Sequence, residues 1–289
     1  MIYNFHQSII FYVKQLKLTT MAIIKPPFEM TGSISGISFY KRYGSDKVYM
    51  RTKGGAKKFT IMNSKKFKKL RMHFPEWAAC VKMSRILCGT MNSVIHLADF
   101  NVSATMNGLS KKMMGPDKVH PIGQRTIQLS ACRYMLDDFQ LNKIHTFASI
   151  LRVTPSWEIK KETMEAIVKI PYINTDIHLV NPYNYPFFRI ITILGIASDM
   201  VFDIENNEYT STLEKNNGKV DVQLTGWYST NRVIEPQELS PNFVKLSYLY
   251  ERNDISLVLS IGVEFGKPDQ DGRPLQVKRA GGARVLGVR

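Results

Sequence analysis

The second half of the chain is dominated by short runs of β-branched and aromatic residues that are interrupted by turn residues. The turns include Asn181–Pro182, Asn206–Asn207 and Ser240–Pro241. Short runs between such turns are typical of antiparallel sheets. We expect strands at residues 148–153, 164–170, 176–180, 187–196, 199–204, 219–227, 243–250 and 255–265. The pattern predicts an immunoglobulin-like antiparallel β-sandwich within an α+β protein.

The charge of the chain lies almost entirely in its first half. The chain holds 39 Lys and Arg against 24 Asp and Glu, for a net charge of +15. Residues 1–143 hold 23 basic and 7 acidic residues, whereas residues 144–289 hold 16 basic and 17 acidic ones. Such an asymmetry favours a cationic part that contacts a polyanion. We expect residues 144–289 to fold alone.

A basic hairpin is predicted near the start. Two short runs, Ile37–Tyr40 and Lys47–Arg51, flank the turn signal Tyr43–Asp46. Alternation along the second run places Tyr49 and Arg51 on one side of the hairpin.

Helices are predicted to follow the hairpin. Asn63 or Ser64 is a good N-cap, and Pro75 either kinks the helix or begins a second one, which would run on to Ala98. We expect residues 101–121 to be a loop and residues 122–141 a further helix. A helical stripe at a spacing of three or four residues is predicted to be core, and it comprises Phe67, Leu70, Phe74, Trp77, Val81, Ser84 and Cys88.

We expect four parts along the chain. Residues 1–20 lack the layout of a secretory signal, and they are either an upstream extension before Met21 or a short amphipathic helix. Residues 21–143 form the basic hairpin and helical region, and 144–272 the β-sandwich domain. Residues 273–289 are a basic tail that either adds an edge strand or stays loose. Since no run of about 18 apolar residues occurs, we expect no membrane association. Because no secretory signal is recognised, we expect a cytoplasmic location.

The segment Gly32–Lys58 resembles the opening of a widespread, uncharacterised Bacteroidetes protein family. It carries Gly-Ser-Ile-x-Gly, then Phe-Tyr-Lys, and then Arg-Thr-Lys-Gly-Gly, followed by basic helices. Leu257–Gly266 and Ala283–Val288 are similar to the usual end of such chains. The resemblance implies a Bacteroidetes source and a natural start at Met21. It implies no activity and no catalytic residue.

Motifs for catalysis or for cofactors are incomplete. The segment Gly262–Lys267 has one residue too few for a phosphate-binding loop, and Pro268 stands where Ser or Thr would hold magnesium. Asp269–Gly272 resembles a calcium loop but lacks its third ligand and its glutamate. The six histidines and three cysteines show no metal-ligand spacing, and Cys80 and Cys88 are expected to be core. We expect no enzyme, no cofactor and no metal.

The densest charge is the candidate functional site. Residues 41–71 hold twelve cations and a single acid, Asp46. Cations neutralise phosphates, and interleaved tyrosines stack on bases. We expect a non-enzymatic protein that binds nucleic acid or another polyanion. The alternative is a structural or assembly protein, from a mobile element or a multi-protein particle, that associates with itself through its sandwich. The predicted contact residues are Lys41, Arg42, Lys47, Arg51, Lys53, Lys57, Lys58, Lys65, Lys66, Lys68, Lys69 and Arg71.

Overall fold

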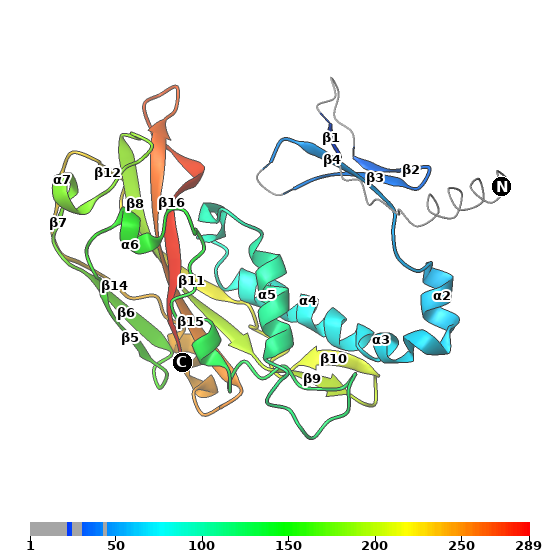
Figure 1. Ribbon diagram of the computed structural model, residues 1–289. Helices are drawn as coiled ribbons and strands as arrows, with labels where there is room; N and C mark the ends of the chain where they lie inside the picture. Colours follow the sequence, from blue (N-terminus) through cyan, green and yellow to red (C-terminus); the bar gives the residue numbers. More distant parts are fainter. Residues whose placement is uncertain (1–21, 25–30, 43–44) are drawn as a thin grey trace, which may run out of the picture. The chain divides into compact units, whose positions relative to one another are not determined.

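The computed structural model describes residues 22–24, 31–42 and 45–289. The chain divides into two compact units, residues 1–64 and 65–289 (Figure 1). The extension predicted at 1–20 and the turn residues Tyr43 and Gly44 lie outside the described residues. The protein is α+β, with antiparallel sheets in its C-terminal part. None of the helices in the described ranges is long and apolar enough to cross a membrane.

The first unit is a four-stranded antiparallel sheet followed by one helix. Its strand order is β1-β4-β3-β2. A two-residue turn at Ser35 and Gly36 joins β2 to β3, and both residues have the positive φ that such a turn requires. The elements are β1 (Ala22–Ile24), β2 (Gly32–Ile34), β3 (Ile37–Lys41), β4 (Val48–Thr52) and α2 (Lys58–Asn63). The hairpin predicted from the sequence is confirmed as β3 and β4.

The second unit is built around a five-stranded antiparallel sheet. The order is β11-β8-β15-β16, and β12 also pairs with β8. β8 pairs with β15 along its whole length, from Phe187↔Gly266 to Ser198↔Ile255. The strands are β8 (Phe187–Ser198), β11 (Val220–Leu224), β12 (Tyr228–Ser229), β15 (Ile255–Pro268) and β16 (Pro274–Val288). The predicted basic tail is therefore a strand, paired with β15.

Smaller sheets complete the second unit. A three-stranded sheet has the order β14-β6-β5, and two further pairs join β7 to β13 and β9 to β10. Their bounds are β5 (Ser156–Lys160), β6 (Glu165–Ile170), β7 (Ile173–Asn174), β9 (Met200–Asp203), β10 (Glu208–Ser211), β13 (Val233–Ile234) and β14 (Gln237–Leu239). The strands predicted at 164–170, 187–196, 199–204, 219–227 and 255–265 are confirmed as β6, β8, β9, β11 and β15.

Helices cover one part of the second unit. The α-helices are α3 (Lys68–Met72), α4 (Phe74–Gly89), α5 (Val102–Lys112), α6 (Phe147–Ile150) and α7 (Thr175–His178). Short 3-10 helices lie at Lys65–Phe67, Ile95–Leu97, Arg133–Met135 and Val244–Leu249. Pro75 lies in the first turn of α4, so a second helix does begin there, but it ends at Gly89.

Several local predictions are wrong. The strands predicted at 148–153, 176–180 and 243–250 are mostly short helices. The predicted loop 101–121 contains α5, because the Asn101 side chain accepts the backbone N–H of Ala104 and caps it. The predicted helix 122–141 consists instead of turns, isolated bridges and the 3-10 turn Arg133–Met135. There Asp117 accepts the backbone N–H of Thr126 at 2.7 Å, a contact from outside the segment.

The five-stranded sheet is buried on both faces. Ile191 and Ile193 of β8 pack into a cluster with α4 and α5, whereas Leu194 and Ile196 pack into a second cluster with the three-stranded sheet. Figure 1 shows the same three layers, with β8, β15 and β16 between α4–α5 and β5–β6–β14. A helical layer over this sheet is not part of the immunoglobulin-like sandwich that the sequence predicts. The boundary predicted at 143/144 therefore falls inside one shared core.

Candidate nucleic-acid interface

Two tyrosines and two arginines form a row on one face of the first unit's sheet. Tyr40 of β3 pairs directly with Tyr49 of β4, and the ring centroids lie 5.7 Å apart with an interplanar angle of 25°. The Arg42 guanidinium lies 4.3 Å from the Tyr49 ring centroid, and that of Arg51 lies 5.4 Å from the Tyr40 centroid. Residues paired across antiparallel strands share a face, which is why four distant positions meet. We call Tyr40, Arg42, Tyr49 and Arg51 the tyrosine–arginine row.

Polar and cationic groups extend this face. Ser38 pairs with Arg51, and its Oγ lies 2.8 Å from Ser33 Oγ on the neighbouring strand. The Lys53 backbone N–H donates to Gly36 O at 2.6 Å, so the pairing continues past β4. Strand alternation then places Lys47 and Lys53, both exposed, on the face of Tyr49 and Arg51. The face combines aromatic rings, hydroxyls and cations.

The opposite face of the same sheet is apolar, and it separates one predicted residue from the others. Lys41 pairs with Val48 and alternates away from Tyr40. Its neighbours on that face are Phe39 and Met50, and Val48 is only 3% exposed. Of the predicted hairpin residues, the structure therefore brings Arg42, Lys47, Arg51 and Lys53 together and places Lys41 on the other side.

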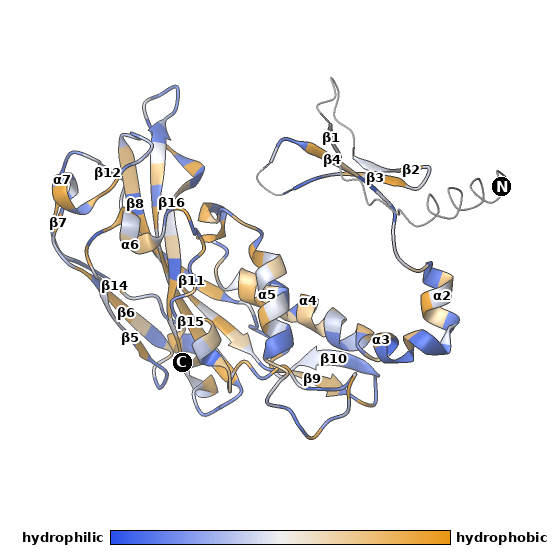
Figure 2. Cartoon of the chain, in the orientation of Figure 1, coloured by the Kyte–Doolittle hydropathy of each residue, from blue (hydrophilic) through white to orange (hydrophobic). Residues whose placement is uncertain are grey.

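The remaining predicted residues lie on short helices. Lys57 and Lys58 stand at the start of α2, in the first unit. In the second unit, four lysines are exposed and Arg71 is half-buried along the 3-10 turn and α3, which Figure 2 shows as mainly hydrophilic. The four lysines are Lys65, Lys66, Lys68 and Lys69. The cations thus form one group in each unit, on consecutive stretches of chain.

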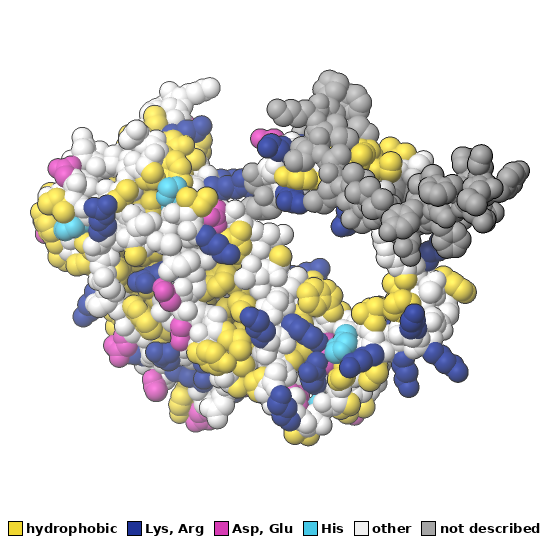
Figure 3. All heavy atoms as spheres, in the orientation of Figure 1, with side chains coloured by type: hydrophobic (Ala, Val, Ile, Leu, Met, Phe, Trp, Pro, Cys, Tyr) yellow, Lys and Arg dark blue, Asp and Glu magenta, His cyan; other side chains and the backbone are white. Residues whose placement is uncertain are grey.

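Large apolar side chains are exposed on the helices of both units that carry these cations, and on α4. Phe59 of α2 is 78% exposed, and Trp77 of α4 is 51% exposed. Met62, Leu70, Met72 and Phe74 are also exposed. Figure 3 shows Lys and Arg side chains around α3 with hydrophobic ones between them. The prediction that Leu70, Phe74 and Trp77 are core is therefore wrong.

The buried face of α4 lies one position away from the predicted stripe. It comprises Glu76, Ala79, Cys80, Met83, Ser84 and Leu87. The sequence argument missed it because a glutamate, which is rarely buried without partners, occupies its first position. Cys80 is core as predicted, and burial raises the pKa of its thiol to about 11, which makes it unreactive at neutral pH. Cys88 is half-buried.

Glu76 is the centre of a charged cluster that the sequence did not reveal. Its Oε1 accepts hydrogen bonds from Arg125 Nε at 2.7 Å and from the Gly123 backbone N–H at 2.9 Å. Its Oε2 accepts a hydrogen bond from Arg125 Nη2 at 2.8 Å. Lys111 Nζ and His73 Nδ1 also contact Oε2. Burial alone would raise the pKa of Glu76, but these partners together hold it well below its ordinary value. The cluster joins α4, α5 and the 115–126 segment.

A second buried carboxylate lies on the helix side of the large sheet. Glu264 of β15 is fully buried and forms an ion pair with Arg189 of β8. The Arg189 guanidinium lies 4.5 Å from the Trp227 ring, and His96 Nε2 lies 2.7 Å from the other Glu264 oxygen. That His96 contact lacks hydrogen-bond alignment. The carboxylate is enclosed by partners from its own chain, as a structural charge is.

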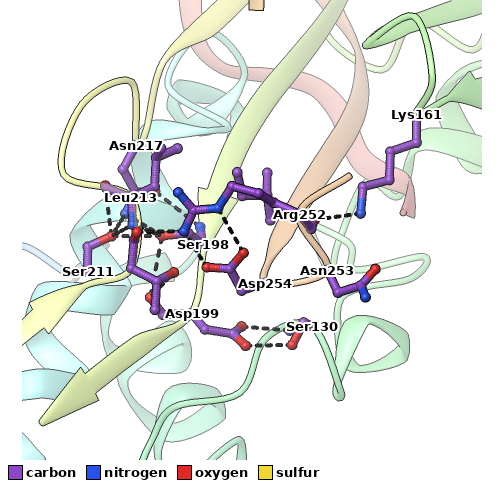
Figure 4. Close-up of polar contacts among 12 residues, drawn as sticks. Ser130, Lys161, Ser198, Asp199, Ser211, Leu213, Asn217, Arg252, Asn253 and Asp254 are labelled. Carbon is purple, nitrogen blue, oxygen red and sulfur yellow. Dashed lines mark hydrogen bonds and ion pairs between the residues drawn. The ribbon is translucent and has the colours of Figure 1, made fainter. Parts of the chain in front are cut away.

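A polar cluster closes the end of the large sheet where β8 ends and β15 begins (Figure 4). Asp199 accepts Ser130 N–H at 2.8 Å and Ser130 Oγ–H at 2.5 Å, and burial raises its pKa. Arg252 Nη2 donates to Asp254 Oδ2 at 2.6 Å, and Lys161 Nζ donates to Arg252 O at 2.9 Å. Each charged group in the cluster has a hydrogen-bond partner within the chain, so we interpret the cluster as structural.

Comparison with known proteins adds no relative. No family model, no curated protein and no solved structure matches this chain. The resemblance of Gly32–Lys58 to a Bacteroidetes family stays a prediction. Over the described residues, no group of three His, Cys, Asp or Glu side chains could hold a metal ion. Function therefore has to be inferred from the basic surfaces and from the tyrosine–arginine row.

Proposed function

We propose that this chain is a non-enzymatic protein that associates with nucleic acid through its basic N-terminal half. The observation that carries the proposal is the tyrosine–arginine row, which places two aromatic rings and two guanidinium groups together on one face of the first unit's sheet. Residues 41–71 hold twelve cations against Asp46 alone, so this stretch cannot neutralise itself. A polyanion with planar groups satisfies both features.

The two kinds of side chain would do different work in such a complex. Exposed lysines such as Lys57, Lys65 and Lys68 neutralise phosphates and release counterions, which gives affinity without sequence preference. The tyrosines supply flat apolar surface for bases or sugars, and this contact does not depend on charge. We expect binding that falls steeply with salt and varies little with sequence.

A gel shift on mixed-sequence DNA and RNA tests the proposal directly. The expected result is a shift at about 50 mM salt that is largely lost by about 200 mM, as for proteins that contact several phosphates. The absence of any shift at about 50 mM salt, with protein in the micromolar range, would reject the proposal.

A second candidate is an assembly protein, a component of a mobile element or a multi-protein particle. The exposed apolar side chains Leu70 and Trp77 of the second unit favour it, because such groups beside charges mark protein interfaces. This surface lies on helices, whereas the assembly alternative predicted from the sequence uses the sandwich. Size-exclusion chromatography without nucleic acid separates the candidates. A defined oligomer that becomes monomeric in Trp77→Ser would support assembly.

Three finer points belong to the same proposal. We place the protein in the cytoplasm of a member of the Bacteroidetes, and the Gly32–Lys58 motif supports the source. Face-to-face packing of the three-stranded and five-stranded sheets supports a sandwich. The helices over the other face of the larger sheet are a layer that an immunoglobulin domain lacks.

A further inference from the structure

We propose that the tyrosine–arginine row binds unpaired bases, so that the ligand is single-stranded nucleic acid in preference to a duplex. This inference rests on the proposed function and deepens it, because it names the class of nucleic acid and the contacting atoms. The argument starts from the geometry of Tyr40 and Tyr49, whose side chains are half-buried on a sheet face.

The flat faces of the two tyrosine rings are suited to stacking against a planar group such as a base. They are paired across β3 and β4 and lie 5.7 Å apart, nearly parallel. In a duplex, base faces are covered by neighbouring bases, and a protein reaches only base edges and phosphates. Stacking on aromatic side chains of a sheet therefore requires unpaired bases, which is how sheet surfaces recognise single strands.

The two arginines are suited to exchange partners when a strand binds. Arg42 and Arg51 are exposed, and each guanidinium lies over one ring. An exposed cation is held only weakly over an aromatic ring, so a base can take its place. The displaced guanidinium then reaches a phosphate of the same strand, with which it forms two parallel hydrogen bonds. In the free protein, the two guanidinium groups therefore already lie next to the rings on which the bases would stack.

The groups around the tyrosine–arginine row are suited to contact the sugar–phosphate backbone of a single-stranded nucleic acid. The hydroxyls of Ser33 and Ser38 lie 2.8 Å apart, and Ser38 is paired with Arg51, so they can donate to sugar or phosphate oxygens. Lys47 and Lys53 stand on the same face by strand alternation. Lys41 alternates to the apolar face, so Lys41→Gln is a control that removes the same charge from the same hairpin.

The test compares two oligonucleotides that differ only in their bases. Fluorescence anisotropy would measure binding of the full chain to a thymidine oligomer and to an abasic oligomer of equal length, at about 50 mM salt. The phosphates are equal in number, so a difference in affinity between the two oligomers comes from contacts to the bases. We expect at least about tenfold weaker binding of the abasic oligomer and of a matched duplex.

Variants locate the effect on the row. Replacing Tyr40 and Tyr49 together by Leu should bring thymidine and abasic oligomers to equal affinity, whereas replacing both by Phe should keep the difference. Lys47→Gln should weaken both oligomers more than Lys41→Gln does.

The two proposals fail in different ways. Equal binding of thymidine and abasic oligomers by the unaltered protein, or tighter binding of the duplex, would overturn the single-strand inference and leave polyanion binding intact. Binding of neither oligomer and no duplex would overturn both. Because the oligomer comparison uses the unaltered protein, the result does not depend on whether the leucine variant folds.

Discussion

Glu76 and Arg125, 49 positions apart in sequence, are joined by two hydrogen bonds of 2.7 and 2.8 Å. Both carboxylate oxygens take part, and Gly123 N–H and Lys111 add further donors. The Glu76 side chain is fully buried. The ion pair therefore connects α4 to the irregular 115–126 segment inside the protein.

Replacing Glu76 by Gln should destabilise the protein strongly. Gln keeps the shape but leaves Arg125 and Lys111 without a buried counter-charge, and breaking such a pair costs about 3–5 kcal/mol. Urea unfolding at pH 7 measures the change. Glu208→Gln is the matched control, because Glu208 is exposed and lies 3.6 Å from Lys82. A control variant as unstable as Glu76→Gln would show that the Glu76 contacts are not special.

The same variant predicts a pH dependence. The folded-state pKa of Glu76 lies below its ordinary value of 4.5, so its contribution is fully present above that value and is lost as pH falls through the folded pKa. The stability gap between parent and variant should therefore be constant from pH 6 to 8 and shrink below about pH 4. The raised pKa of Asp199 acts with the opposite sign, so Asp199 contributes most at low pH. A gap that does not change between pH 3 and 7 would contradict the ion pair.

Two leucines on neighbouring helices test the corrected face. Leu87 of α4 is fully buried and Leu70 of α3 is 44% exposed. Leu87→Ala should cost about 2–5 kcal/mol through lost burial and a cavity. Leu70→Ala should stay within about 0.5 kcal/mol of the parent. Thermal unfolding of both variants measures this, and equal losses would support the stripe predicted from the sequence instead.

Two glycines should respond to alanine in opposite directions. A Cβ on Gly195 of β8 would lie 2.4 Å from Thr90 Cβ, whereas one on Gly108 of α5 meets nothing within 4 Å. Gly195→Ala should cost about 1–3 kcal/mol by overpacking. Gly108→Ala should add about 0.5–1 kcal/mol of helix stability. Melting temperatures that move in the same direction would contradict the close approach of the helical layer to β8.

Locally encoded elements could be predicted, and elements that depend on distant partners could not. The hairpin of β3 and β4 follows from alternation and a turn, which neighbouring residues determine. The same alternation predicts that Tyr49 and Arg51 share a face, and the register agrees. The stacking of Tyr40 on Tyr49 needs the register itself, which the sequence does not state.

The faces of α4 show why other predictions fail. Hydrophobic spacing favours Trp77 and Val81, but burial follows Glu76, Cys80 and Met83, because the glutamate's partners arrive from residues 111–125. Composition hides α5 in the same way, since Asn101 and Gly108 look like loop residues. The sequence predicts which residue types make up the candidate site. That Lys41 lies on the opposite face from the tyrosine–arginine row follows only from the strand pairing in the structure.

The shared core predicts which fragment folds. Residues 65–289 should unfold cooperatively when expressed alone, whereas residues 144–289 should not, in contrast to the expectation from charge and pattern. Without α4 and α5, the helix-side residues Ile191, Ile193 and Val258 would face water. Near-ultraviolet circular dichroism of both fragments measures fixed packing. A sharp thermal transition in 144–289 would show that the helical layer is dispensable.

A charge-matched pair of variants isolates the basic surface. The test variant changes four exposed lysines of the candidate surface to Gln, namely Lys57, Lys58, Lys65 and Lys66. The control variant makes the same change at four exposed lysines of the second half, namely Lys215, Lys245, Lys267 and Lys278. Both lose four positive charges, so a difference between them reflects position alone.

The salt dependence of nucleic-acid binding in these two variants is the most direct test of the central claim. Each lost phosphate contact should flatten the slope of log affinity against log salt by about 0.9 for duplex DNA and about 0.7 for single strands. We predict a flatter slope and weaker binding to all sequences alike in the test variant, with the control variant close to the parent. Unchanged affinity and slope in the test variant at moderate salt would contradict the claim that this surface binds nucleic acid.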